Sequence, residues 1–421
     1  MKTLFKLVLS LVLLLTLPAA VQAQFTFTTN NGTITITGYI GSGGVVTIPG
    51  TIVVNGVSLP VTIIGDSAFS NNSTVTSVAI PNTVTNIGTS TFYMCIYLTS
   101  ATIGTNVTSI GSSAFDYCLS LTNVVIPNSV TNIGRSAFYS CYRLTSLTIG
   151  TNVVSIGNDA FYGCSGLSSV KIPNSVTSLG DEAFTSCLCL TDVTLGTSIT
   201  NIGFRMFESC PLTSVTFPTN VINIGGSAFY RCGSLSSVTI PDSVTSIGFY
   251  AFGNTGLTNA IIGNRVISID YNAFNGCGNL TSAIIGRSVP SLGANMFYSC
   301  SSLKSVYFLG DAPSVGPNVF YGDPNVIVYY MPGTTNWAST LGGAPTMLWN
   351  PQAQQVGVRT NSFGFRIIGT PNIPIVVEAC TNLTSASWTP LQNCTLTNGA
   401  LYFSDSRWTN YPARFYRLRS P

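Results

Sequence analysis

Residues 144–166 of the chain read LTSLTIGTNVVSIGNDAFYGCSG, and close copies of this stretch fill most of the sequence. The Phe near its end recurs in steps of 23 residues, twice shortened to 22. Its positions are Phe69, Phe92, Phe115, Phe138, Phe161, Phe184, Phe207, Phe229, Phe252, Phe274, Phe297 and Phe320. Repetition at such a period indicates a solenoid, because one copy cannot bury its apolar face without neighbours on both sides.

The first half of each copy predicts a short strand that ends in a sharp corner. Leu144, Leu147 and Ile149 alternate with Ser and Thr near the end of the run, and a period of two residues is typical of a strand. Directly after it stands Pro or Gly, as at Pro127 and Gly150. Both suit a corner, Pro because its φ is preset and Gly because it tolerates unusual φ.

The second half predicts an apolar pair followed by a tight turn. Val153 and Ile156 form the pair in the quoted copy, and a Gly follows them. After this Gly, each copy has a short stretch that reads Ser-Ala-Phe-Tyr at residues 136–139 of the preceding copy and is typical of one helical turn. Asp66 and Asp181 stand where they would cap this turn in their own copies. We expect the twelve recurring Phe side chains to form a continuous structural core.

The two ends of the repeat array depart from the pattern and predict caps. In residues 24–59, Thr and Ile alternate from Thr33 to Thr37, and a Gly-rich turn at residues 41–44 would close a β-hairpin over the first copy. Residues 60–322 form the solenoid of about twelve repeats. Residues 323–349 form the cap at the other end, where the apolar segment 326–332 closes the stack.

Residues 350–421 predict a separate small antiparallel β-domain, so the fold class is a mostly β repeat solenoid followed by a small all-β domain. Trp388 and Trp408 are expected in the core of that domain. Cys380 and Cys394 stand on two predicted strands and are candidates for a disulfide. The alternative is that they are two buried thiols.

The first residues predict export. Lys2 and Lys6 precede an apolar run at residues 7–17, and Val21-Gln22-Ala23 forms a small-x-small cleavage site. We expect residues 1–23 to be a signal peptide cleaved near Ala23. No later apolar run approaches about 20 residues, so no membrane span is expected in the mature chain. The predicted location is secreted or at the cell surface.

The repeat unit resembles a known family. Its consensus, Leu-Thr-Ser-Val-x-Ile-Pro-Asn-Ser-Val-Thr-x-Ile-Gly-x-x-Ala-Phe-x-x-Cys, is similar to the BspA-like leucine-rich repeat, the leucine-rich repeat 5 type, over about residues 60–322. This resemblance implies a secreted or surface-exposed protein, and some family members are adhesins that bind host or matrix proteins. The segment from Val377 to Leu383 and the final Phe-Tyr-Arg-Leu at 415–418 are similar to carboxy-terminal modules of secreted bacterial proteins, and this implies no activity.

Composition excludes several classes of chemistry. The chain has no histidine, which removes Ser-His-Asp and Cys-His catalysis and the common zinc sites. Without Lys2 and Lys6 the formal charge falls from +3 to +1, so no nucleic-acid footprint is expected. Asp181 and Glu182 are the only adjacent acids, and capping and surface roles explain them better than a glycosidase pair. We expect no enzyme, no cofactor and no metal.

Nine cysteines stand three residues after the repeat Phe. They are Cys95, Cys118, Cys141, Cys164, Cys187, Cys210, Cys232, Cys277 and Cys300. A metal ladder or a chain of disulfides would use them, but Asn72 and Thr255 fill the same slot in other copies. Since a small buried thiol packs well, a core column is the preferred interpretation. Cys189 lies outside this register and is expected to be a free thiol.

Two surfaces are candidates for binding. A Tyr directly follows the repeat Phe at Tyr93, Tyr139, Tyr162, Tyr230, Tyr298 and Tyr321. If the Phe points inward, these rings form an interrupted stripe along one edge, suited to proteins or glycans; alternatively they only cover the turn of the adjacent copy. The outward strand positions give hydroxyl-rich rows at Thr145, Ser146, Thr148, Ser168, Ser169, Lys171, Thr191, Asp192 and Thr194, which are also ordinary solvent-facing strand residues.

These observations predict an exported, non-enzymatic protein that binds a protein ligand on another cell or matrix. A polysaccharide-binding or glycan-binding module that uses the tyrosines and hydroxyls is the alternative. A carboxylate-dependent glycoside hydrolase acting through Asp181 and Glu182 is the weaker alternative.

Overall fold

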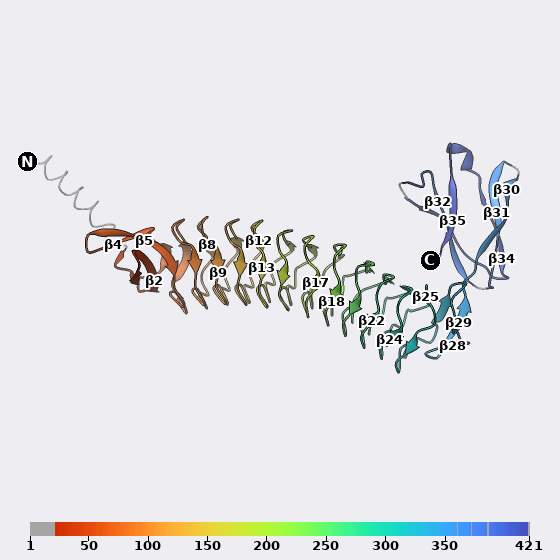
Figure 1. Cartoon of the computed structure of the whole chain (residues 1–421), viewed down its shortest axis with the longest axis horizontal. Helices are drawn as coiled ribbons and strands as arrows, with labels where there is room; N and C mark the ends of the chain where they lie inside the picture. Colours follow the sequence, from red (N-terminus) through yellow and green to blue (C-terminus); the bar gives the residue numbers. More distant parts are fainter. Residues whose placement is uncertain (1–21, 360, 372, 385–386, 420–421) are drawn as a thin grey trace, which may run out of the picture.

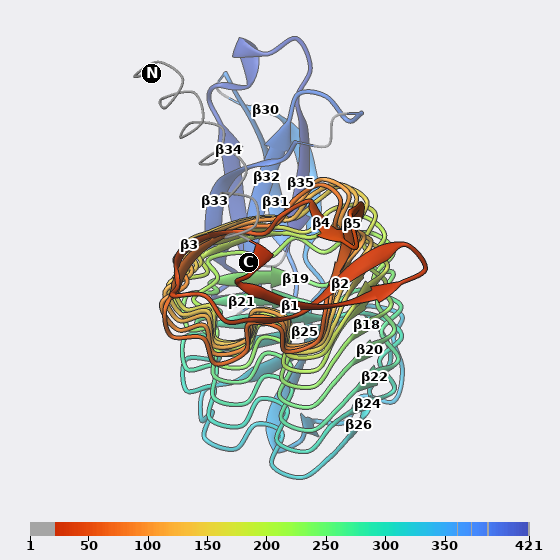
Figure 2. The ribbon, with the colours of Figure 1, turned by 90° about the vertical axis from the view of Figure 1, so that its left-hand side faces the viewer.

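The computed structural model describes residues 22–359, 361–371, 373–384 and 387–419, so the predicted signal peptide lies almost wholly outside the described residues. The chain forms a β-solenoid of about 13 turns, followed by small antiparallel sheets (Figure 1). Viewed along the rod, successive coils superimpose, and each repeat position forms a column (Figure 2). The predicted fold class is confirmed.

Two parallel ladders run along the solenoid. The first, whose outward side we call the strand face, comprises β3 (Gly44–Thr47), β6 (Val75–Ala79), β8 (Ser100–Thr102), β10 (Asn123–Val125), β12 (Ser146–Thr148), β14 (Ser169–Lys171), β16 (Asp192–Thr194), β19 (Ser237–Thr239), β21 (Asn259–Ile261), β23 (Ser282–Ile285), β25 (Ser305–Phe308), β27 (Ile327–Tyr330) and β29 (Ala344–Leu348). Equivalent residues of successive coils are paired, as Val124 is with Leu147. Residues 212–217 form no strand, and the rod bends near this coil (Figure 1).

The second ladder follows the apolar pair of each copy. It comprises β5 (Val57–Ile64), β7 (Asn86–Ile87), β9 (Ser109–Ile110), β11 (Asn132–Ile133), β13 (Ser155–Ile156), β15 (Ser178–Leu179), β17 (Asn201–Ile202), β18 (Asn223–Ile224), β20 (Ser246–Ile247), β22 (Ser268–Ile269), β24 (Ser291–Leu292) and β26 (Ser314–Val315). Ile133 pairs with Ile156 in the same register. The two ladders therefore enclose one apolar core along the rod.

The repeat Phe rings fill this core as predicted. Phe69 to Phe297 are at most 2% exposed, and Phe320 in the last coil is 7% exposed. Neighbouring rings are stacked, with centroids between 4.9 and 5.8 Å apart. The spacing is close to that of paired strands, about 4.8 Å, so the ladder holds each ring in contact with the next.

The Ser-Ala-Phe-Tyr stretch forms no helical turn, which corrects the expectation. In the coil of Phe138, Ser136 and Ser140 have left-handed φ values of 53° and 55°. Alternate N–H groups leave the coil: those of Ser136, Phe138 and Ser140 donate to the carbonyls of Asn158, Ala160 and Tyr162 in the next coil. The N–H groups between them bond three residues back, so the segment is a succession of tight turns bonded to its neighbour.

Asp66 and Asp181 do not cap a helix, because no helix is present. Asp66 Oδ1 accepts the N–H of Thr89 in the next coil at 2.7 Å. Asp181 Oδ1 accepts the N–H of Phe204 at 2.8 Å. Both carboxylates therefore bridge two coils, and an aspartate directly after the Gly that precedes the turn has a structural role.

The corner glycines are required for close approach and not for unusual φ. Gly150 does not have a positive φ, but a Cβ on it would lie 2.3 Å from the carbonyl oxygen of Pro127 in the preceding coil. Gly104 meets Pro81 in the same way, also at 2.3 Å. The expectation that Gly serves here through its φ freedom was wrong, since the constraint comes from the neighbouring coil.

The N-terminal segment covers the first coil, but its turns differ from the expected ones. β1 (Phe25–Asn30) and β2 (Thr33–Tyr39) are joined at Asn31–Gly32, and β4 (Thr51–Val54) joins β5 at Asn55–Gly56. All four turn residues have positive φ, which Asn-Gly turns require. The glycines at residues 41–44 form no hairpin turn; they lead into β3, which pairs in parallel with β6.

At the other end, the ladder continues past the segment expected to close it. β27 pairs with β25 and also with β29, which forms a hairpin with β28 (Thr340–Leu341). Two three-stranded antiparallel sheets follow. They contain β30 (Gln352–Arg359), β31 (Ser362–Ile368), β32 (Pro374–Cys380), β33 (Thr389–Thr395), β34 (Ala400–Asp405) and β35 (Phe415–Arg419), with a 3-10 turn at Trp408–Asn410.

These C-terminal sheets pack on the strand face of the last coils. Their core, which includes Phe365, Ile375 and Phe403, continues into Tyr307 and Tyr329 of the solenoid. Trp349 Nε1 donates to the carbonyl of Pro374 at 3.0 Å across the junction.

The tryptophans predicted for that core lie elsewhere, and both are only partly buried. The Arg417 guanidinium lies 4.4 Å from the ring of Trp388, and Trp408 packs beside Phe363 at 6.2 Å. The indole N–H of Trp408 is buried without a hydrogen-bond partner in the described structure, and smaller apolar side chains form the core instead.

Replacing Gly150 with Ala tests the coil contact. We expect G150A to lower the free energy of unfolding by about 1–3 kcal/mol, because overpacking forces the two backbones apart. The matched control is G233A, where an added Cβ meets nothing within 4 Å, and we expect it to be neutral or stabilising by up to about 1 kcal/mol. Urea unfolding followed by far-UV circular dichroism measures both; equal midpoints would contradict the interpretation.

Candidate binding surface

The segment around the repeat Phe forms one edge of the solenoid, which we call the turn edge; residues 135–140 are one example. All six predicted tyrosines lie on it, and each is partly or well exposed. Tyr321 in the last coil is the most exposed, at 62%. The edge consists of turns without helix or strand. Its backbone repeats from coil to coil, whereas the exposed side chains on it differ.

Four rings form a first aromatic cluster in consecutive coils: Tyr93, Tyr117, Tyr139 and Tyr162. Their neighbouring centroids lie 6.3, 5.7 and 4.8 Å apart. Sequence reasoning missed Tyr117, because it stands one position later than the others. Asp116 occupies the usual position and is buried, and burial raises its pKa to about 6. The Tyr117 ring therefore lies between those of Tyr93 and Tyr139, in the coil where Asp116 stands at the usual tyrosine position.

A second aromatic cluster lies further along the edge and contains arginines. Its rings are those of Phe204, Tyr230, Phe249, Tyr250 and Tyr271, with neighbouring centroids between 5.4 and 6.4 Å. Arg205 lies over Phe204 at 5.0 Å, and Arg231 lies over Tyr230 at 5.2 Å. Only Tyr230 was predicted. The others lie in neighbouring columns, which can be recognised only after the coils are aligned in register.

The geometry of the rings limits what they can bind. Tyr139 and Tyr162 are stacked with an interplanar angle of 10°, and Tyr298 and Tyr321 with one of 13°. Stacked rings cover each other's faces, so they present edges and hydroxyl groups outward. A pyranose ring that stacks on an aromatic side chain needs a free face, which these pairs offer only at their outer ends.

Charged groups lie in the coils of both clusters and between them. Arg135 pairs with Asp159 at 3.4 Å, and Arg205 pairs with Glu208 at 3.0 Å. Burial raises the pKa of Glu182, and the neighbouring acids, Asp159 first, raise it further. Asp181 already accepts a backbone N–H. The adjacent acid pair is therefore part of the coil contacts and the local charge pattern.

The hydroxyl rows of the strand face serve partly within the fold. The hydroxyls of Thr145 and Thr191 donate to carbonyls of the preceding coil at 3.1 and 3.3 Å. The nine strand-face residues predicted as a flat surface are exposed. A shallow groove of about 640 Å³ crosses this face between Ser100 and Thr148. The C-terminal sheets cover the last coils of the same face.

The nine in-register cysteines form a buried column of hydrogen-bond donors. Each is 0% exposed. The Cys118 thiol donates to the carbonyl of Phe92 in the preceding coil at 3.2 Å, and the other eight make equivalent bonds. Burial raises the pKa of Cys164 to about 12, so its donor proton is retained. Within the described residues, no three His, Cys, Asp or Glu side chains are grouped as metal ligands would be.

Cys380 and Cys394 are not joined, which corrects the predicted disulfide. In the antiparallel register Cys394 stands opposite Ile375, whereas Cys380 stands opposite Phe415. The two cysteines are therefore about five residues apart along the sheet, roughly 17 Å at the usual strand rise. Both are free thiols, as is Cys189, which is exposed.

The last coil replaces the column cysteine with an acid. Asp323 is 4% exposed, and neither of its carboxylate oxygens has a hydrogen-bond partner. Burial raises its pKa from 3.8 to about 7. A protonated carboxyl group can donate like the thiols before it, whereas a carboxylate cannot.

Comparison with known proteins gives a family match. The profile of the BspA type leucine rich repeat region, in six copies, matches residues 53–168, 108–235 and 200–327. No curated protein matches the chain. A leucine-rich repeat protein from Bacteroides ovatus is 24% identical, covers 78% of this chain and 98% of its own, and superimposes with a TM-score of 0.57. A leucine rich cell surface protein from Faecalibacterium prausnitzii is 27% identical, with 77% and 92% covered and a TM-score of 0.47.

Within the described ranges, the chain contains no helix with the length and apolar character that a membrane span needs.

Alkylation of the folded protein tests the thiol assignments. We expect iodoacetamide to modify Cys189 rapidly and the nine column cysteines only after unfolding, because all nine are buried in the core and out of reach of the reagent. Peptide mass spectrometry without reductant should recover Cys380 and Cys394 as free thiols. Rapid labelling of the column, or a linked peptide containing both C-terminal cysteines, would contradict the structure.

Asp323 makes stability depend on pH. Because its folded pKa of about 7 exceeds the ordinary 3.8, the folded chain holds the proton more tightly than the unfolded chain. The contribution to stability is therefore greatest below pH 3.8 and is lost as the pH rises through about 7. We expect D323C, which extends the thiol column, to reduce this dependence to the part that Asp116 and other acids contribute, and D192N on the exposed strand face to leave it unchanged. Thermal unfolding between pH 4 and 8 measures both; equal pH profiles for D323C and the unsubstituted chain would contradict this role.

Proposed function

The chain belongs to the BspA-type leucine-rich repeat family, and we propose that it is a non-enzymatic protein that binds a partner protein through the turn edge. The observation that supports this most directly is the pair of aromatic clusters on that edge. They contain nine rings, from Tyr93 to Tyr271, held at coil spacing on a rigid backbone. Tyrosine and arginine are the residue types that most often carry the binding energy of protein interfaces.

The arrangement favours a protein over a glycan. Two of the seven ring contacts in these clusters are stacked, that of Tyr139 with Tyr162 and that of Phe249 with Tyr271, and the other five are tilted or edge to face. Stacked and edge-to-face contacts both cover a ring face that a sugar would need. Such a surface offers apolar area with hydrogen-bonding tips, which suits side chains and backbone of a protein. Arg205 and Arg231 add planar cations that are already ordered against rings, so that less conformational entropy is lost on binding.

We further propose that the protein acts outside the cell, either secreted or at the cell surface, on a ligand of another cell or matrix. The amino-terminal sequence supports export, since Lys2, Lys6 and the apolar run at residues 7–17 precede the cleavage site near Ala23. A low content of charged residues, 7%, also suits contact with broad and weakly charged partners.

Catalysis has little support in the residues. The sequence has no histidine. Asp181, the first member of the adjacent acid pair, accepts the Phe204 N–H in a coil contact. The matched family and the related structures are leucine-rich repeat proteins. A binding role uses what the turn edge offers, whereas a hydrolase needs a placed acid and base.

Binding to immobilised matrix proteins and to a polysaccharide array tests the proposal. We expect the chain without residues 1–23 to bind at least one protein, and the variant Y139A/Y162A to weaken that binding at least about tenfold, since central interface rings contribute 1–2 kcal/mol or more. The matched control is T148A/T194A on the strand face, which should bind normally. Binding to polysaccharides alone, or loss of binding only in the strand-face variant, would refute the role of the turn edge.

A further inference from the structure

At the turn edge, every coil except the last donates three N–H groups to the next coil. In the eleven coils from Phe69 to Phe297, the donors are the repeat Phe and the residues two before and two after it. In the coil of Phe297, Asn295, Phe297 and Ser299 donate to the carbonyls of Pro317, Val319 and Tyr321 at 2.9, 3.0 and 2.8 Å. The acceptors are thus always three carbonyls at alternate residues.

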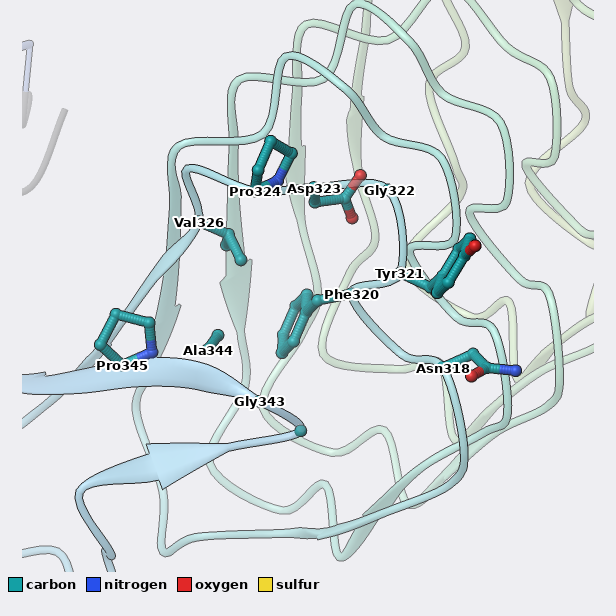
Figure 3. Close-up of a pocket in the computed structure, with 11 residues that line it drawn as sticks. Asn318, Phe320, Tyr321, Gly322, Asp323, Pro324, Val326, Gly343, Ala344 and Pro345 are labelled. Carbon is teal, nitrogen blue, oxygen red and sulfur yellow. The ribbon is translucent and has the colours of Figure 1, made fainter.

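The last coil has the same donors and no acceptors. Among the described residues, no hydrogen bond involves the backbone N–H of Asn318, Phe320 or Gly322. All three residues line a cavity of about 460 Å³ between the turn at 318–324 and the hairpin residues 342–345 (Figure 3). Figure 3 shows the Phe320 ring directed toward Gly343 across this space, with Tyr321 on the outer side.

The opposite end of the solenoid is closed by the chain itself. Tyr39 donates its N–H to the carbonyl of Ala68 at 3.0 Å. Its ring stacks on Phe69 at 5.1 Å, as the ring of another coil would. Nothing in the described chain does the same for the donors at the far end. An unpaired row of backbone groups at the end of a ladder is where a further chain segment can add.

We propose that this end cleft binds a polypeptide segment of a partner protein in the turn conformation of a coil, whose carbonyls at alternate residues accept the N–H groups of Asn318, Phe320 and Gly322. One apolar side chain of the segment lies against Phe320 and the prolines at 324 and 345 that line the cleft. The site differs from the turn-edge clusters, so the proposal stands or falls separately from the proposed function.

The cleft favours a peptide over an anion. The three donors repeat a spacing that eleven coils satisfy with peptide carbonyls, and a single anion cannot reach all three of such a row in the same way. Asp323 also lies in the lining, buried and without a partner. A second negative group beside it would be disfavoured, whereas a neutral peptide is not.

A peptide taken from the chain itself is a suitable probe. Residues 248–257, GFYAFGNTGL, contain no cysteine, and the carbonyls of Phe249, Ala251 and Gly253 within them accept the N–H groups of the preceding coil. We expect weak binding, because a free peptide must be ordered when it binds. A scrambled peptide of the same composition is the control.

Residue-resolved amide hydrogen exchange on the full chain is the measurement. Alone, the amides of Asn318, Phe320 and Gly322 should exchange freely, while Asn295, Phe297 and Ser299 one coil earlier are protected. Millimolar probe peptide should slow the first three at least tenfold. Y321A at the rim of the cleft should weaken this effect, and Y402A in the C-terminal sheets should not.

Each contrary result overturns the proposal in a distinct way. Protection of the three amides in the chain alone would show that the chain fills its own cleft. Equal protection by the scrambled peptide, or none by the probe, would remove the peptide specificity. Protection by inorganic phosphate without protection by the probe would make the cleft an anion site.

Discussion

Each coil is stable only because two others cover it, and this contact between coils constrains almost every residue type in the repeat. The backbone of one coil approaches the next so closely that the corner at Gly150 has no room for a Cβ. The Phe rings stack, the thiols donate to carbonyls of the preceding coil, and the turn donates N–H groups to the following one. The column thiols and, in every coil but the last, the turn N–H groups directed to the next coil are thereby paired, which avoids the cost of leaving them unsatisfied.

The same constraint separates residues that only resemble functional ones from those free to vary. The column cysteines, the aspartates that follow a glycine and many of the threonine hydroxyls have partners in an adjacent coil, as Cys141, Asp66 and Thr145 do. The exposed side chains at the turn edge do not make the same contact with an adjacent coil in every copy. Tyrosine, arginine, acid and serine replace one another there, so specificity for a partner can change without disturbing the stack.

The fold could be predicted from the sequence because the apolar pattern around the repeat Phe occurs twelve times. A copy that departs from this pattern can be interpreted from the others. What failed were details decided between coils. The segment 136–139 has helical composition, but bonds to residues 158–162 hold it in left-handed turns. Tyr117 and Tyr271 join the aromatic clusters from neighbouring columns, which no rule based on the position after Phe could select. The C-terminal domain has no repeat to average over, and there the disulfide and the tryptophan core were wrong.

The ends of such a stack are not equivalent, and the difference is chemical. One end of the turn column presents carbonyls and the other presents N–H groups, so two copies of the chain would be complementary end to end. The Tyr39 strand occupies the acceptor end with its own N–H and ring. Closing one end is enough to prevent open-ended stacking of copies, because a heterologous contact needs both surfaces. The donor end can therefore remain open without leading to filaments, which leaves its three N–H groups accessible to a different chain.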